Sequence, residues 1–278
     1  MPLTFVPTPL GNLRDITLRA LDALRECDLL VAEDTRVARK LLNALNLPSK
    51  PLLSYREQNA KAVTAKIIHA ARKENVAVVS DAGMPAISDP GADLIAAARN
   101  AGITIEALPG PSAVLGAAVL SGFDLHEFAF GGFLPRKSRA RKAAFDLLAQ
   151  GGRPTTVWFE SPNRIRAALA DLEAVDSSRR CFLLREYTKL HEQQIAGTAS
   201  DVAAELSETV RGEIVLVVEG GGKQAAPVID FNRAADALFK QRESVAAIAK
   251  TLAQRGFGPR REIYSRLLQR KERERRKR

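Results

Sequence analysis

The stretch NVAVVSDAGMPAISDPG, residues 75–91, runs from a short apolar segment directly into a loop rich in glycine, proline and aspartate. An apolar run of this length that ends at turn residues is typical of a strand buried in a parallel sheet. Open α/β sheets bind ligands beyond the carboxyl ends of their strands, so we expect the loop at 80–91 to line a binding crevice. Its carboxylates can accept hydrogen bonds, and its glycines let the backbone approach a ligand closely. The alternative is a plain turn in which Asp89 caps the next helix.

Apolar, β-rich runs alternate with helical patterns on both sides of this stretch. Such alternation is typical of α/β domains that are built around largely parallel sheets. In the first half we expect strands at 3–8, 28–34, 75–83 and 103–110, and helices at 16–26, 34–45, 57–74 and 91–101. These elements predict an N-terminal α/β domain over residues 1–110.

The segment PGPSAV, residues 109–114, is expected to be the hinge into a second α/β domain at 111–222. Pro-Gly-Pro continues neither a helix nor a strand, although a helix that begins near Ser112 could also direct backbone N–H groups at an anion. Only two residues separate the runs at 180–188 and 191–198, so these strands should be antiparallel and the second sheet mixed. The remaining strands are expected at 127–135, 155–162 and 212–221.

The net charge of +10 belongs to one end of the 278-residue chain. Residues 1–222 hold 26 Lys plus Arg and 26 Asp plus Glu, whereas residues 223–278 hold 16 and 6. The segment therefore favours a polyanionic partner such as nucleic acid. It begins with the linker-like stretch GGGKQAAP and continues with helical patterns at 233–241, 244–255 and 260–270.

Two helices and a Gly-containing turn at 256–259 give this segment the pattern of a helix-turn-helix. Arg260 and Arg261 stand at the start of the second helix and are candidate RNA contacts. The same pattern is common in proteins that bind no nucleic acid. We expect a small all-helical module over 223–278.

A second cationic segment, RKSRARK at 136–142, contains no acidic residue. Such a run is ordinarily a solvated loop. Beside an active-site crevice it would bind phosphates without regard to sequence and with strong dependence on salt. Its candidate RNA-binding residues are Arg136, Lys137, Arg139, Arg141 and Lys142.

Composition and motifs exclude several classes of protein. Cys27 and Cys181 are the only cysteines, and the three histidines lie far apart, so neither a disulfide framework nor a metal site is expected. The longest uncharged run, 107–123, is shorter than a bilayer span, and the N-terminus lacks the pattern of a secretory signal. We therefore expect a soluble cytoplasmic protein without a membrane partner. The sequence contains no GxGxxG, GxxxxGK[ST], HExxH or GxSxG motif. We therefore expect any cofactor to be bound by residues outside these standard motifs.

Two charged clusters, AEDTRVARK at 32–40 and REYTKLHEQ at 185–193, follow predicted strands. Clusters of this kind are often structural ion pairs, but at strand ends they can also supply a general base or substrate contacts. The candidates for a catalytic role are Asp34, Glu186 and Lys189, together with Glu33 and His191. The sequence does not choose among them.

Eight motifs, in order over residues 3–220, resemble the ribosomal RNA small subunit methyltransferase I family of the tetrapyrrole methylase superfamily. They are VPTPLGNLRDIT, AEDTRVARKLL, SDAGMPAISDPG, ALPGPSAV, GFLPRK, FESPNRI, REYTKLHE and GEIVLVVEG. The resemblance implies a class III methyltransferase fold, with S-adenosylmethionine in a crevice between two α/β domains, and a homodimer. It implies 2′-O-methylation of a decoding-centre cytidine, cytidine-1402 of 16S rRNA, within the 30S subunit, without a metal.

The resemblance also implies where the cofactor binds. The family's contacts fall on the loop after the third predicted strand, on the start of the second domain and on a strand end, and more loosely on 185–188 and 212–218. The residues concerned are Asp81, Gly83, Met84, Pro85, Ile87, Gly110, Pro111, Ser112, Phe159 and Glu160. Phe159 is a candidate for stacking on a planar ring, or simply ends a buried strand.

Two rival functions stay open. A tetrapyrrole methyltransferase acting on precorrin or uroporphyrinogen would share the cofactor fold. The chain departs from that branch because the loop at 7–12, Pro-Thr-Pro-Leu-Gly-Asn, is not glycine-rich. A helix-turn-helix DNA-binding regulator would place its recognition helix in the major groove and transfer no methyl group. Its recognition helix would be very short before the Arg-rich end.

Overall fold

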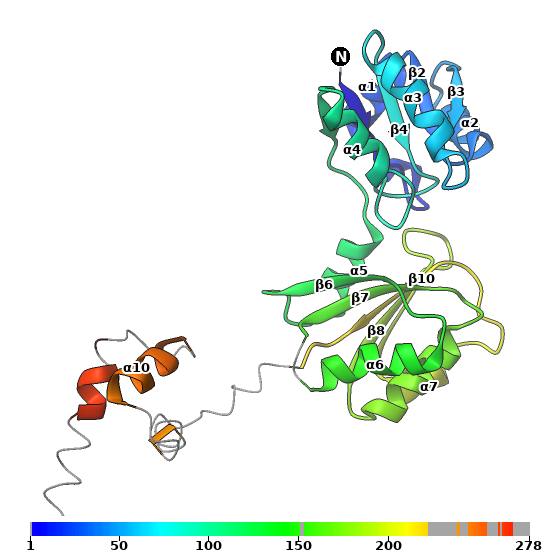
Figure 1. The fold of residues 1–278 in the computed structure, drawn as a ribbon. Helices are drawn as coiled ribbons and strands as arrows, with labels where there is room; N and C mark the ends of the chain where they lie inside the picture. The colour runs from blue at the N-terminus through cyan, green and yellow to red at the C-terminus, as the bar shows by residue number, and fades with distance from the viewer. Residues whose placement is uncertain are drawn as a thin grey trace, which may run out of the picture. The chain divides into compact units, whose positions relative to one another are not determined.

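The structure, a computed structural model, describes residues 2–150, 153–221, 238–239, 244–254, 261 and 263–268. By its internal contacts the chain divides into two units, Met1–Gly222 and Lys223–Arg278. The larger unit contains two sheets of five strands each, one following the other along the chain (Figure 1). This arrangement agrees with the predicted fold class of two α/β domains and a helical C-terminal module.

The first sheet has the strand order β3-β2-β4-β1-β5, and every neighbouring pair is parallel. Its strands are β1 (Leu3–Phe5), β2 (Leu29–Ala32), β3 (Leu52–Ser54), β4 (Val76–Val79) and β5 (Ile105–Ala107). Four of them confirm predicted strands, whereas β3 was not predicted. Because all five strands are parallel, the loops that follow them meet at one edge of the sheet.

Helices cover both faces of the first sheet. They are α1 (Leu18–Glu26), α2 (Thr35–Ala44), α3 (Ala60–Ala71) and α4 (Ala92–Asn100), with a short 3₁₀ turn, η1, at Leu13–Asp15. The four helices confirm the predicted ones, and their apolar residues lie in two separate buried clusters. Leu24 of α1 and Leu42 of α2 belong to one cluster, and Ile67 of α3 and Leu94 of α4 belong to the other.

The second sheet is mixed, with the strand order β6-β7-β10-β8-β9. Its strands are β6 (Phe128–Phe133), β7 (Thr155–Glu160), β8 (Arg180–Arg185), β9 (Gln193–Thr198) and β10 (Ile214–Val218). The predicted antiparallel pairing of β8 with β9 is confirmed. β10 is antiparallel to β7, so the start of β10 lies beside the end of β7.

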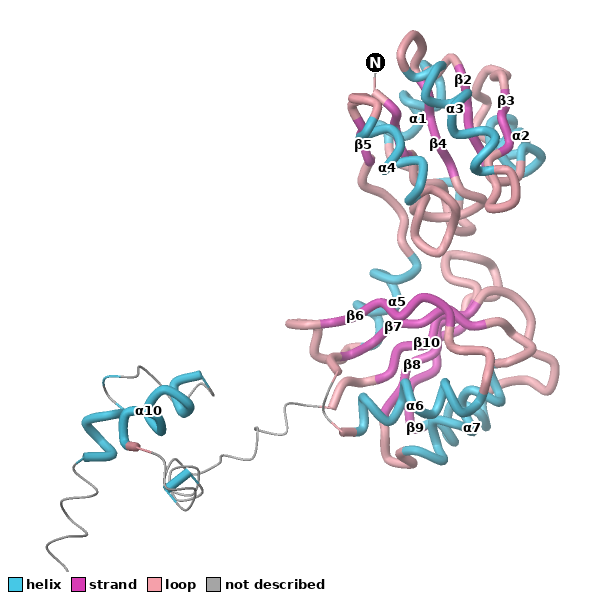
Figure 2. The backbone as a smooth tube through the Cα atoms, in the orientation of Figure 1, coloured by secondary structure: helices cyan, strands magenta, loops and turns pink. Residues whose placement is uncertain are grey.

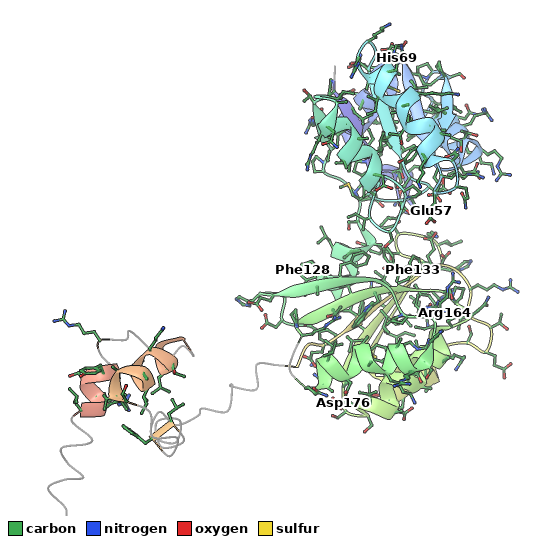
Figure 3. The ribbon with its side chains drawn as sticks, in the orientation of Figure 1. Glu57, His69, Phe128, Phe133, Arg164 and Asp176 are labelled. Carbon is green, nitrogen blue, oxygen red and sulfur yellow. The ribbon has the colours of Figure 1, made fainter. Side chains whose placement is uncertain are left out.

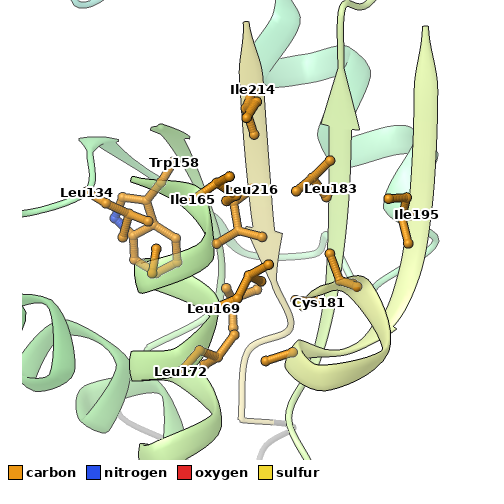
Figure 4. Close-up of a cluster of buried hydrophobic side chains, with 14 of the residues drawn as sticks. Leu134, Trp158, Ile165, Leu169, Leu172, Cys181, Leu183, Ile195, Ile214 and Leu216 are labelled. Carbon is orange, nitrogen blue, oxygen red and sulfur yellow. The ribbon is translucent and has the colours of Figure 1, made fainter. Parts of the chain in front are cut away.

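Helices also cover the second sheet on both faces. α6 (Ser138–Ala149), α7 (Ile165–Val175) and α8 (Ala199–Glu205) pack over a buried cluster that includes Trp158, Leu183 and Leu216 (Figure 4). α5 (Ala113–Ser121) begins at the predicted hinge, is capped by the Ser112 hydroxyl, and packs on β7, β8 and β10. Figure 2 shows the strands and helices of each half with their connecting loops.

The structure corrects one part of the predicted cationic strip. Helix α6 begins at Ser138, which places Arg141 on its buried side rather than in a solvated loop. The side chain of Arg141 is 5% exposed and its guanidinium lies 2.5 Å from the Asp171 carboxylate of α7. Arg141 Nε and Ser138 Oγ each donate a hydrogen bond to Asp171 at 2.8 Å. Arg141 is therefore a structural residue and is not available to bind RNA.

The C-terminal unit is described only in part. Its described helix α10 (Val245–Gln254) confirms the predicted helix at 244–255, and residues 263–268 are helical as well. Leu238, Ile248, Leu252, Ile263 and Leu267 are buried together. The expected linker beyond Gly221 and the candidate RNA contact Arg260 lie outside the described residues. Within the described residues, no helix combines the length and apolar character needed to cross a membrane.

Candidate active site

An apolar pocket of about 320 Å³ lies between the loops of the first sheet and the strand ends of the second. The first sheet contributes Leu10 after β1, the loop after β4, and Ala113 just beyond β5. The second sheet contributes residues at the end of β6, at the end of β7 and at the start of β10. A concave, mostly apolar cavity of this size is typical of a site for a small molecule or cofactor. The lining is Leu10, Ala82, Gly83, Met84, Ile87, Ser88, Asp89, Ala113, Phe133, Phe159, Glu160, Ser161, Pro162 and Gly212 to Val215.

The loop after β4 holds an unusual backbone conformation. Gly83 has a φ of +79° and is joined to Thr8 by two backbone hydrogen bonds of 2.9 and 3.0 Å. Ala86 and Ser88 have φ values of +68° and +63°, which are uncommon for residues that carry a Cβ atom. Backbone conformations of this kind persist where surrounding contacts enforce them, and they cluster at functional sites.

The alternative that Asp89 caps the following helix is wrong. Helix α4 begins after Gly91, and no side chain caps it. Asp89 instead lines the apolar pocket, and burial raises the pKa of its carboxyl group, an effect opposed by a hydrogen bond with Ser80. The loop therefore turns its side chains to the crevice, as the binding interpretation expects.

The residues predicted to bind the cofactor are only partly brought together. Gly83, Met84, Ile87, Phe159 and Glu160 line the apolar pocket. Asp81 lines a neighbouring polar pocket, and Pro85 is buried. Gly110, Pro111 and Ser112 form the connection into α5 and are not among the lining residues, although Ala113 is.

Leu10 and Phe133 are among the lining residues that were not predicted from the sequence. Leu10 packs against Gly83, where an added Cβ atom would lie 3.0 Å from Leu10 Cδ2. Phe133, labelled in Figure 3, is 58% exposed. Its ring stacks edge-on against Phe159 at a centroid distance of 5.5 Å. An aromatic residue directly after two glycines, GGF at 131–133, was the available signal.

Glu160 is held in place below the surface. Its side chain is fully buried, and Arg164 Nη2 lies 2.7 Å from its carboxylate. Glu160 also accepts a 2.6 Å hydrogen bond from the Ser161 amide, while Arg164 donates to the Leu134 carbonyl at 2.6 Å. The pair therefore joins the end of β7 to the end of β6 and fixes one wall of the apolar pocket.

A polar pocket of about 440 Å³ lies next to the apolar one, and Ser88 lines both. It forms where β3, β2 and β4 end side by side, because the loops after parallel neighbours meet at one edge. The lining is Glu33, Asp34, Arg36, Arg56, Glu57, Gln58, Asp81, Ser88 and Pro90. Arg56, Glu57 and Gln58 were missed because β3 is only three residues long and was not predicted.

The Asp34 carboxylate is hydrogen-bonded and ion-paired at the start of α2. Its carboxylate caps the helix by accepting from the Arg36 amide at 2.8 Å, and Arg36 Nη2 lies 2.5 Å from its second oxygen. Arg56 Nη2 lies 3.4 Å from the same oxygen. The hydrogen bonds of Arg36 hold the pKa of Asp34 well below its ordinary value, so Asp34 stays ionised.

Glu33 has the opposite electrostatic environment. Burial raises the pKa of its carboxyl group, and the nearby carboxylates of Asp81 and Asp89 raise it further. Arg56 opposes this shift only in part. A raised pKa makes the Glu33 carboxylate a stronger base than an ordinary glutamate.

The second charged cluster is a separate ion-pair network. Lys189 Nζ lies 2.9 Å from Glu186 Oε1 and 3.0 Å from Glu213 Oε2. A hydrogen bond from the Glu213 amide lowers the pKa of Glu186, and Lys189 lowers it further. Although burial favours a lower pKa for Lys189, the hydrogen bonds to Glu186 and Glu213 raise it overall. A lysine base would need a lowered pKa, and the shift at Lys189 has the opposite direction, which disfavours Lys189 as the base.

The loop that carries this network contacts the loop that follows β1 of the first sheet. The Asn12 amide donates to Thr188 Oγ1 at 3.2 Å, and Gly11 lies directly against Lys189. Neither Glu186 nor Lys189 lines either pocket, and His191 is exposed. The structure thus separates the five catalytic candidates into two groups. Glu33 and Asp34 line the polar pocket, whereas Glu186 and Lys189 line neither pocket but contact Glu213, which lines the apolar one.

The remaining predicted RNA contacts lie on the surface. Arg136, Lys137, Arg139 and Lys142 are exposed, and Lys142 Nζ lies 3.6 Å from Asp171. Arg261 is exposed in the C-terminal unit. Among the residues that the structure describes, no group of three or more His, Cys, Asp or Glu side chains is placed to hold a metal ion.

Comparison with known proteins first defines the class. Residues 2–203 match the family model of the Tetrapyrrole (Corrin/Porphyrin) Methylases. Uroporphyrin-III-C-methyltransferase from Thermus thermophilus has a similar structure, with a TM-score of 0.54, 22% identity, and coverage of 78% of this chain and 94% of that one. A diphthine synthase gives a TM-score of 0.60 at 16% identity, covering 79% and 90%. The fold is that of the tetrapyrrole methylases.

Sequence relatives define the family. The ribosomal RNA small subunit methyltransferase I of Halalkalibacterium halodurans is 36% identical over 95% of this chain and 93% of its own length. The protein of the same name from Thermotoga maritima is 42% identical over 78% of this chain and 98% of its own length. The chain therefore belongs to the ribosomal RNA small subunit methyltransferase I family within the tetrapyrrole methylases.

Proposed function

We propose that this chain is an S-adenosylmethionine-dependent methyltransferase of ribosomal RNA. More specifically, we propose that it methylates the ribose 2′-hydroxyl of cytidine-1402 of 16S rRNA within the 30S subunit. The observation that supports this most is the apolar pocket beside a polar pocket that Glu33 lines, in a chain whose relatives carry that name. Incubation with radiolabelled S-adenosylmethionine and either 30S subunits or precorrin tests it. Label in 16S rRNA alone is expected, whereas label in precorrin would favour the tetrapyrrole alternative.

The residues of the apolar pocket fit S-adenosylmethionine. The aromatic rings of Phe133 and Phe159 can pack against a purine, face-on or edge-on. The backbone of the loop at 82–84 can approach the cofactor closely at Gly83. Ala113 is the first residue of α5, so backbone N–H groups of the first helical turn lie at the wall, suited to a carboxylate. When bound, S-adenosylmethionine supplies a methyl group on a sulfonium that is already a good leaving group. The proposed reaction therefore needs no metal.

The protein's own contribution would be to orient the ribose, exclude water and accept a proton. A carboxylate with a raised pKa is a stronger base than an ordinary one, and among the five catalytic candidates predicted from the sequence Glu33 has that property. Asp34 is held in its ion pair with Arg36 and is a weak base. We propose Glu33 as the proton acceptor and Asp34 as the residue that positions Arg36 and Arg56.

Replacing Gly83 with alanine is expected to weaken S-adenosylmethionine binding about tenfold. A φ of +79° disfavours a residue with a Cβ atom, and that atom would crowd Leu10 in the pocket wall. Calorimetric titration measures the dissociation constant. The control is Gly102→Ala, which has a similar φ of +70° but open space around the added atom and lies outside the pocket. An equal loss of affinity in both variants would contradict the proposed cofactor site.

Deleting residues 223–278 is expected to weaken binding to 30S subunits and to flatten its salt dependence, because the segment carries the whole positive net charge. Affinity for S-adenosylmethionine should not change, since the pocket lies entirely within the first unit. Filter binding over a range of salt concentrations measures the first effect. A truncated chain that keeps full subunit affinity but loses cofactor binding would contradict this division of roles.

We further propose a homodimer. One face of α5 exposes Leu115 at 55%, Val119 at 70% and Leu120 at 38% of their surfaces. Neighbouring apolar side chains exposed on one helix are typical of a surface that another protein covers. A second copy of the chain would cover this face.

A further inference from the structure

We propose that the polar pocket binds the base of the target nucleotide, with Arg56 donating to the Watson–Crick edge of a cytosine and Glu57 accepting from it. The inference rests on the proposed function, which requires a ribose at the opening between the two pockets. Ser88 lines both pockets, so a nucleotide that enters the polar pocket would present its sugar beside the apolar one. Enzymes that modify a nucleotide commonly extrude it and read its Watson–Crick edge in such a pocket.

The charge of the polar pocket favours a base over a phosphate. Carboxylates outnumber guanidiniums by four to two among its lining residues. A phosphate would be repelled by this excess of negative charge, which acts at short range. A neutral base that carries both donors and acceptors matches a lining of guanidinium, amide and carboxylate groups.

Arg56 is oriented before any ligand arrives. Its Nε donates to the Glu33 carbonyl at 2.9 Å, and its Nη2 lies 3.4 Å from Asp34. Its backbone amide donates to Asn59 Oδ1 at 2.7 Å, and the Asn59 amide group donates to the Ser54 carbonyl at 3.0 Å. A guanidinium has more N–H donors than these contacts use, so donors remain for the ring nitrogen and the carbonyl oxygen of a pyrimidine.

Glu57 supplies the acceptor that distinguishes cytosine. It is exposed, follows Arg56 directly, and lies at the end of the first half that bears the strand-end loops (Figure 3). Cytosine presents an amino donor at position 4, where uracil presents a carbonyl acceptor, and carboxylates accept from the cytosine amino group. A carboxylate at this place would therefore admit cytosine and disfavour uracil.

The test compares initial methylation rates on 30S subunits that carry either cytidine or uridine at the target position. Glu57→Gln replaces the acceptor by an amide that can also donate, so the cytidine-to-uridine rate ratio is expected to fall at least about fivefold relative to wild type. Arg56→Lys keeps the charge but loses the planar donor pair, and is expected to lower the ratio as well. The control Arg39→Gln removes an exposed arginine of α2 that lies outside both pockets, and should leave the ratio unchanged.

The outcomes separate this inference from the proposed function. If wild type methylates 16S rRNA but both variants keep the wild-type ratio, the base-reading role is wrong and the proposed function stands. If Glu57→Gln instead weakens S-adenosylmethionine binding in the absence of RNA, the pocket serves the cofactor and the inference is overturned. If wild type methylates no 16S rRNA, the proposed function fails and this inference falls with it.

Discussion

Replacing Glu33 by glutamine is expected to slow methyl transfer by about 10²–10⁴-fold, because that is the contribution of a positioned general base. Glutamine preserves the size of the side chain and removes only its ability to accept a proton as a base. Affinity for S-adenosylmethionine is expected to stay at the wild-type value, since Glu33 lines the polar pocket and not the apolar one. Single-turnover methylation with saturating 30S subunits and a separate cofactor titration measure the two quantities.

The pH dependence gives this prediction a second readout. A base acts as its ionised form, and burial and the neighbouring carboxylates of Asp81 and Asp89 raise the pKa of Glu33. The wild-type rate should therefore fall as the pH decreases through a value above the ordinary glutamate range, and the residual rate of Glu33→Gln should lack that step. Glu74→Gln, an exposed glutamate outside both pockets, is the matched control. A Glu33→Gln enzyme with a near wild-type single-turnover rate would exclude Glu33 as the base.

Replacing Asp171 by alanine is expected to lower the free energy of unfolding by about 3–5 kcal/mol. The change leaves the Arg141 guanidinium, whose side chain is 5% exposed, without its carboxylate partner. It also removes the acceptor of the Ser138 hydroxyl at the start of α6. Loss of this contact should loosen the packing of α6 on α7. Denaturant unfolding followed by circular dichroism measures the effect.

The Asp171 carboxyl also predicts how stability depends on pH. Burial alone would raise its pKa, but the hydrogen bonds from Ser138 and Arg141 lower it overall. A lowered pKa in the folded state stabilises the fold above the unfolded-state pKa, and this contribution is lost as the pH falls through the folded-state value. Asp146→Ala, at an exposed aspartate of α6, should change stability by no more than about 0.5 kcal/mol. Equal losses in the two variants would contradict the structural role of the Asp171–Arg141 pair.

Hydrophobic patterning predicted most of the fold. The apolar run before Ser80 gave β4, and the two-residue connection between the runs at 180–188 and 191–198 gave the antiparallel pair β8 and β9. The missed strand, β3, has only three residues, too few for a period to be recognised. That omission hid three of the nine lining residues of the polar pocket. Arg56 and Glu57 become neighbours of Glu33 only once β3 is placed beside β2.

Electrostatic roles were harder to predict than positions. Arg141 belongs to a run of cations in the sequence, and only the start of α6 at Ser138 decides that it faces inward to Asp171. Glu33 and Asp34 are adjacent in sequence and both partly exposed, but their pKa shifts have opposite signs. Desolvation and neighbouring carboxylates dominate at Glu33, whereas hydrogen bonds from Arg36 dominate at Asp34. Sequence spacing gives neither burial nor partner, so the sequence alone could not rank the five catalytic candidates.

The proposed function is tested most directly by mapping the methylated nucleotide after reaction of the purified full-length chain with S-adenosylmethionine and 30S subunits that lack the modification. We predict a single new 2′-O-methyl group, on cytidine-1402 of 16S rRNA. A methyl group on a base, on a different nucleotide, or on no nucleotide of 16S rRNA would contradict that function.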